Sequence, residues 1–115
     1  MPEDRPVMTA LAEITAVSLL RSNLPAREHM VARLAALVAV DAPTASYVLN
    51  ASTAVETGIT VEDVQDLLVA VAPIVGTARI VSAAERITEA LGLVIELAIA
   101  ELAAELEAEQ AVSDD

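Results

Sequence analysis

The sequence contains no cysteine, lysine, tryptophan or phenylalanine, and Tyr47 is its only aromatic residue. Without cysteine the chain forms no disulfide, offers no thiolate metal ligand and performs no thiol redox chemistry of its own. No apolar run reaches the roughly 18 residues of a membrane-spanning helix, because Arg33, Pro73, Arg79 or Glu96 interrupts each long one. The sequence therefore predicts neither a redox-active thiol nor a transmembrane segment.

Positive charge is also scarce, and the formal net charge is −12. Residues 1–40 hold four arginines and four acids, whereas from Ile87 onward there are eight acids and no base. Nucleic acids and anionic membranes bind basic surfaces, so we expect neither as a partner. The opening residues 1–4 are acidic where a secretory signal is basic, which favours a cytoplasmic protein.

What the chain has in abundance is small and branched apolar residues, since 56% of its 115 residues are hydrophobic. That length fits one domain, spanning residues 1–115. A chain so apolar leaves contiguous apolar surface on a monomer, which usually marks an interface. We therefore expect a homo-oligomer, with a monomeric alanine-rich bundle as the alternative.

Proline, glycine and capping residues divide the chain into helices, with no strand predicted. Asp41 is expected to cap the third helix, Gly58 to end it in a left-handed turn, and Thr60 to cap the fourth. Pro73 is expected to kink or end the fourth helix, and Gly92 is a potential break in the fifth. The expected helices span about residues 7–20, 26–40, 44–57, 61–73 and 77–109. This is an all-α bundle of five to six helices.

The last expected helix is apolar nearly all round over residues 91–102, which read LGLVIELAIAEL. A helix that is apolar on every side requires burial on every side, and subunit packing supplies it. Glu101, Glu105 and Glu109 follow at i, i+4 spacing, where like charges and the helix dipole oppose helix formation. We therefore expect the acidic tail, residues 108–115, to fray.

Asn50, Ala54 and Gly58 are followed by an acidic first turn at 62–63, a leucine pair at 67–68 and then Gly76. Over residues 25–90 this joint spacing resembles the carboxymuconolactone decarboxylase and alkylhydroperoxidase AhpD superfamily, whose members carry a histidine at the position of Asn50. The resemblance implies an AhpD-like helical bundle, assembled as a trimer or as a hexamer built from trimers.

The chain departs from the superfamily where its chemistry resides. The resemblance places Pro43 and Ser46 at the positions of the Cys-x-x-Cys pair, so thiol peroxidase activity by the family route is excluded. Asn50 cannot exchange a proton near neutral pH, so the general acid–base role of the histidine is lost too. The resemblance thus indicates a catalytically degenerate member, with no cofactor or metal, that has a small-ligand-binding or structural role.

Small polar residues recur along one face of the third helix, at Ser46, Asn50, Thr53 and Thr57. Together with Tyr47, the first three of these are our candidate ligand-binding residues, because they would form one wall of a small polar pocket. The alternative is that short side chains allow close helix packing while their polar groups bond to the preceding turn. Tyr47 likewise can line that pocket or fill core space.

Two further functional classes stay open. A lactone- or carboxylate-processing enzyme, of decarboxylase or isomerase type, would use Glu28 or His29 as proton carrier and Asn50 as an electrostatic stabiliser. An acidic helical adaptor would instead expose its C-terminal helix to a basic partner. For His29 the alternative to catalysis is a solvated or packed side chain.

Overall fold

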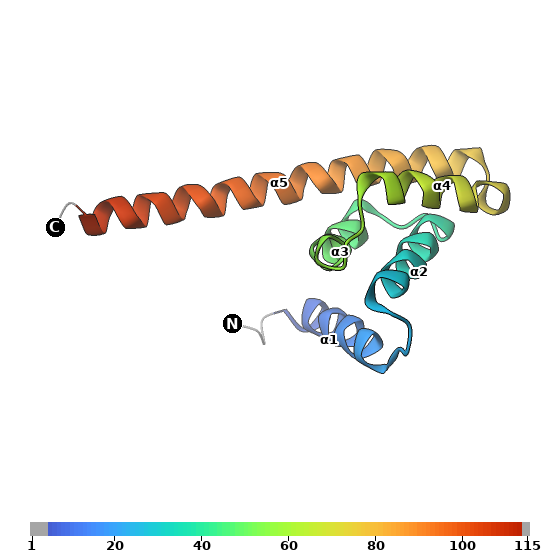
Figure 1. The fold of residues 1–115 in the computed structure, drawn as a ribbon, viewed down its shortest axis with the longest axis horizontal. Helices are drawn as coiled ribbons and strands as arrows, with labels where there is room; N and C mark the ends of the chain where they lie inside the picture. The colour runs from blue at the N-terminus through green and yellow to red at the C-terminus, as the bar shows by residue number, and fades with distance from the viewer. Residues whose placement is uncertain (1–4, 114–115) are drawn as a thin grey trace.

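The computed structural model describes residues 5–113, which form five helices and no strand. The helices are α1 (Pro6–Arg21), α2 (Ala26–Ala39), α3 (Thr44–Glu56), α4 (Val61–Val75) and α5 (Thr77–Ser113). The predicted all-α class is confirmed for this part of the chain, and most expected helix ends lie within two residues of the observed ones. Figure 1 shows α5 running past the four shorter helices.

The turn between α3 and α4 follows the local signals in the sequence. Gly58 adopts a φ of 88°, the left-handed conformation that glycine tolerates best. At the start of α4 the Thr60 hydroxyl accepts a hydrogen bond from the Asp63 backbone N–H at 3.1 Å, and the Asp63 carboxylate accepts one from the Thr60 N–H at 2.9 Å. Asp63 also pairs with Arg27 of α2 at 2.5 Å. This capping box therefore ties α4 to α2 as well as starting it.

The prediction that Asp41 caps α3 is wrong. Pro43 occupies the N-cap position, and no side chain caps that helix end. Asp41 instead lies in the turn after α2 with a φ of 56°, a left-handed conformation that aspartate adopts more readily than most residues. Its carboxylate accepts hydrogen bonds from Ser82 and Arg86 of α5. The Asp41 carboxylate therefore pairs with the distant Arg86 and does not cap α3.

The expected end of α4 at Pro73 lies two residues later, at Val75, and the expected interruption of α5 does not occur. Proline has no backbone N–H to donate to the preceding turn, which disfavours a helix that continues far beyond it. The α5 helix continues through Gly92 to Ser113 and so includes most of the tail expected to fray. Alanine, leucine and glutamate have high helix propensity, and repulsion between exposed carboxylates is weakened by water. Residues 114–115 of the predicted tail lie outside the described residues.

The core lies where α2, α3, α4 and α5 meet. Its buried cluster consists of Leu34, Ala42, Tyr47, Leu67 and Ala90. In Figure 1 α1 lies on one side of α3 and α5 on the other. The α1 helix has no buried residue, and the Arg33 guanidinium reaches it by donating to the Thr15 carbonyl at 2.5 Å. The helix that begins the described chain thus lies against the bundle without joining its core.

The second half of α5, residues 91–111, projects beyond the bundle; we call it the arm. Every arm side chain is exposed except that of Val94, which is partly buried. The chain exposes 8106 Å², whereas a compact monomer of 11.9 kDa exposes about 6,000 Å². Its radius of gyration is 17.1 Å, against about 13 Å for a compact domain of this length. A single copy therefore leaves the apolar arm uncovered.

None of the described helices is both long enough and apolar enough to cross a membrane.

Candidate functional site

The α3 helix presents two different rows of side chains about a quarter-turn apart. Tyr47, Ala51 and Ala54 follow i, i+4, i+7 spacing and face α4 and α5. The polar row at positions 46, 50, 53 and 57 has the same periodicity on the adjacent face. Helical geometry therefore separates Tyr47 from the polar residues that the sequence analysis grouped with it.

The first row opens into a cavity of about 390 Å³ between α3, α4 and α5, which we call the Tyr47 cavity. Its walls are almost entirely aliphatic, and the polar residues Thr60, Gln65 and Thr88 also line it. The main aliphatic lining residues are Leu34, Ala51, Ala54, Ile59, Val64, Leu67, Leu68, Ile87, Ala90 and Leu91. Four small alanines, at 51, 54, 84 and 90, leave space that larger side chains would fill.

Tyr47 is the notable polar group of this cavity. The residue is 4% exposed, and its hydroxyl has no hydrogen-bond partner among residues 5–113. Burial raises the pKa of that hydroxyl; the nearby Arg86 guanidinium partly opposes the rise and the Asp41 carboxylate adds to it. The phenol is therefore neutral at physiological pH and keeps its proton available for donation. A buried hydroxyl without a partner is unfavourable, and an acceptor that reached it after a small movement of the surrounding side chains would remove that cost.

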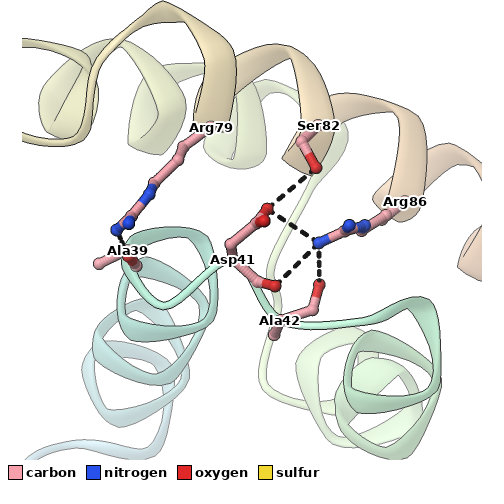
Figure 2. Close-up of polar contacts among 6 residues, drawn as sticks. All are labelled: Ala39, Asp41, Ala42, Arg79, Ser82 and Arg86. Atoms are coloured by element: carbon pink, nitrogen blue, oxygen red, sulfur yellow. Dashed lines mark hydrogen bonds and ion pairs between the residues drawn. The ribbon is translucent and has the colours of Figure 1, made fainter.

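Contacts between the α2–α3 turn and α5 determine where α3 begins, and so where Tyr47 lies. One Arg86 nitrogen donates to the Asp41 carboxylate and carbonyl at 2.8 Å each, and to the Ala42 carbonyl at 2.9 Å. Ser82 donates to the same carboxylate at 2.9 Å, and Arg79 donates to the Ala39 carbonyl (Figure 2). These contacts hold the turn against α5 five residues before Tyr47.

The polar row of α3 makes local hydrogen bonds. The Asn50 side-chain amide donates to the Ser46 carbonyl at 2.9 Å, and the Thr57 hydroxyl donates to the Thr53 carbonyl at 2.8 Å. The Asn50 side-chain oxygen accepts from Arg33 at 3.3 Å. These bonds correspond to the packing alternative for this row, in which side chains bond to the preceding turn.

A second cleft, of about 300 Å³, separates α1 from α2 and α3. Leu11, Thr15, Leu19, Arg33 and Thr53 are among its lining residues. The predicted ligand-binding residues are therefore divided: Tyr47 lines the first cavity, Thr53 lines the second cleft, and Ser46 and Asn50 line neither.

Among the described residues, the two candidate proton carriers form no hydrogen bond with this polar row. Glu28 is exposed, whereas His29 is 7% exposed and its Nε2 atom has no hydrogen-bond partner in the described part of the chain. Over residues 5–113 neither of them hydrogen bonds to Asn50, whose charged partner is Arg33. Arg33 was missed as a site residue, although its position within the apolar stretch VARLAALVAV of α2 was a usable signal.

Within the described chain, no three His, Asp or Glu side chains are grouped to hold a metal ion. No family model, curated protein or solved structure matches this sequence. Membership of the AhpD-like superfamily therefore stays a prediction, and the geometry of the Tyr47 cavity carries the functional argument.

Proposed function

We propose that this chain binds a small, largely apolar molecule in the Tyr47 cavity, with the Tyr47 hydroxyl as its polar anchor. The observation that carries the proposal is the coincidence of an aliphatic cavity with a buried hydroxyl that lacks a partner. Small-molecule sites are typically apolar concavities with a few polar groups that orient the ligand. This cavity is apolar, it lies at the lower end of the usual size range, and Tyr47 is one of its lining residues.

The chemistry of the cavity restricts the ligand to neutral molecules with one hydrogen-bond acceptor, such as a ketone, ester or ether. A charged group would lose its hydration among aliphatic walls without gaining an opposite charge. The raised pKa of Tyr47 keeps its hydroxyl protonated, so it donates to an acceptor on the ligand. Aliphatic contacts supply the affinity, and the hydroxyl supplies selectivity for the acceptor.

This role agrees with a catalytically degenerate AhpD-like bundle better than with a lactone- or carboxylate-processing enzyme. The enzyme alternative requires a proton carrier beside Asn50, and the side chain found there is Arg33. A guanidinium stays protonated in proteins and cannot act as a general base. We therefore propose non-redox ligand binding and do not assign a catalytic role to Glu28, His29 or Asn50.

We also propose that the chain functions as a homo-oligomer, with the trimer and hexamer implied by the superfamily as the expected assemblies. One copy exposes roughly 2,000 Å² more than a compact protein of its mass. That excess is larger than the roughly 800 Å² that each partner buries in a standard protein interface. The adaptor alternative also requires an exposed acidic arm. It is tested directly by measuring whether the chain binds a basic protein.

Calorimetric titration with acetophenone and ethylbenzene tests the ligand proposal. Both molecules are monosubstituted benzenes of similar size, but only acetophenone carries a carbonyl acceptor. We expect the wild-type protein to bind acetophenone about three- to tenfold more tightly, the value of one hydrogen bond. In Tyr47→Phe the two affinities should become equal. The Ala54→Leu variant, which fills the cavity, should weaken both ligands.

Equal affinities in the wild-type protein, or binding of both ligands that Ala54→Leu leaves unchanged, would contradict the proposal. The second result would locate the apolar binding on the exposed arm. Gln65→Ala serves as a control, because that exposed side chain lies at the cavity and its removal leaves the hydroxyl in place.

A further inference from the structure

The arm carries an exposed apolar stripe with the spacing of a helix–helix contact. Ile95, Ile99, Leu102 and Leu106 follow one another at intervals of four, three and four residues, which places them on one face. Each of these side chains is at least half exposed. Such a stripe pairs with a second helix of similar periodicity, and no described helix of the same copy covers it.

The α1 helix carries a matching stripe on the side turned away from the bundle. Val7, Ile14 and Val17 lie on one face, and Arg21 continues that face one turn later. Val7 is 70% exposed and Ile14 is 66% exposed. These residues do not line the cleft between α1 and the bundle, so the stripe remains available to another helix.

The distribution of charge indicates whether the arm pairs with the arm of another copy or with α1 of another copy. The arm contains five glutamates and no base, so pairing two arms would bring acidic faces together without compensation. Residues 5–40 contain four of the six arginines against Glu13 and Glu28. Arg21 is exposed and forms no ion pair with the described residues, so it can meet an arm glutamate. Like charges oppose arm–arm pairing, and this arginine favours α1.

We propose that the arm of one copy docks along α1 of a second copy, apolar stripe against apolar stripe. The excess exposed surface of a single copy is larger than the roughly 800 Å² that each partner buries in a standard interface, so it is sufficient for such a contact. The contact is heterologous, because two different surfaces meet. A two-fold dimer makes it twice by exchanging arms, and a closed ring makes it once per subunit.

This contact specifies the interface of the proposed homo-oligomer and so rests on that part of the proposed function. It is independent of ligand binding in the Tyr47 cavity. The residues that carry it, the two stripes and Arg21, are not among those that line that cavity. Loss of one function therefore leaves the other measurable.

Single cysteines test the contact, because the chain has no natural cysteine. Ile14→Cys is prepared with natural isotopes and Leu102→Cys with ¹⁵N, and the two are mixed in urea, refolded together and oxidised mildly. Mass spectrometry then separates mixed dimers from dimers of either variant alone. We expect the mixed disulfide to be the main product. Main products that pair Leu102→Cys with itself, or yields no higher than an Ile74→Cys control gives, would overturn the proposal.

Sedimentation of serine variants provides the second measurement. Leu102→Ser on the arm and Ile14→Ser on α1 should each weaken self-association about tenfold or more, because each removes a large apolar side chain from the contact. Ile74→Ser is the matched control, since Ile74 is 86% exposed on α4 and belongs to neither stripe. Helix content measured by circular dichroism should be unchanged in all three. Self-association that all three variants leave intact would overturn this interface while leaving the oligomer proposal standing.

Discussion

The Arg86 guanidinium lies 2.8 Å from the Asp41 carboxylate, forty-five residues earlier in the chain, and also donates to the Asp41 and Ala42 carbonyls. Asp41 has a left-handed backbone conformation that turns the chain from α2 into α3. Because α3 starts two residues after Ala42, this pairing determines how α3 lies against α5. The position of Tyr47 in its cavity depends on it.

Arg86→Leu should lower the free energy of unfolding by about 1–2 kcal/mol. The guanidinium satisfies two backbone carbonyls and a carboxylate, and partial exposure of both partners to water reduces the value of the ion pair. Urea denaturation at a fixed chain concentration measures the change. Glu89→Gln, a nearby change at an exposed residue of α5, is the control and should have almost no effect. An Arg86→Leu protein as stable as that control would refute this role.

Tyr47→Phe should leave the unliganded protein equally stable or make it more stable, by up to about 1 kcal/mol. The variant removes a buried hydroxyl that has no partner and keeps the aromatic ring. The same denaturation assay measures the change. Destabilisation of more than about 1 kcal/mol would indicate that the hydroxyl is already hydrogen bonded within the fold. A stable Phe variant that loses acetophenone selectivity would identify a hydroxyl retained for binding.

Ionisation of Tyr47 should reduce stability at alkaline pH. Burial raises its pKa in the folded protein above the ordinary value of 10.0, so the unfolded chain releases the proton first. Stability is therefore complete below pH 10 and is lost as the pH rises towards the folded pKa. Absorbance near 295 nm follows this titration without interference, because Tyr47 is the only tyrosine. A midpoint at or below the ordinary value in folded protein would contradict the buried position.

Thr60→Ala should destabilise the fold by about 1 kcal/mol, the usual effect of losing an N-cap side chain. Thr60→Ser, which keeps the hydroxyl that accepts from the Asp63 backbone N–H, should retain most of the stability. Thermal unfolding of the two variants provides the comparison. Equal losses of stability in Thr60→Ala and Thr60→Ser would show that the capping hydrogen bond contributes little.

Local sequence signals predicted the helices, because each helix end is determined by a few neighbouring residues. Gly58 and Thr60 mark the α3–α4 turn through backbone conformation and capping, and both effects act within four residues. The role of Asp41 could not be predicted in this way, since its partners are about forty residues away on α5. Pro73 marked the end of α4 to within two residues, because proline has no backbone N–H to donate to the preceding turn.

The candidate site was predicted only in its parts. Tyr47 was singled out as the sole aromatic residue, but its cavity is completed by Ala51, Ala54 and Leu67, which look like ordinary core residues in the sequence. Asn50 was expected beside Tyr47, whereas a quarter-turn of α3 directs it towards Arg33 on α2. The angle between the two rows follows from the helical period of α3. Which neighbouring helix each row faces depends on the relative placement of the helices, and periodicity within one helix carries no information about that.

The most direct test of the account is the ¹³Cζ chemical shift of Tyr47 during titration with acetophenone. This carbon bears the hydroxyl, and a single tyrosine gives one resolved signal. We predict a saturable shift with acetophenone, caused by the new hydrogen bond, and a much smaller shift with ethylbenzene. A Tyr47 signal that stays unchanged while acetophenone binds elsewhere would contradict the claim that this hydroxyl anchors a ligand.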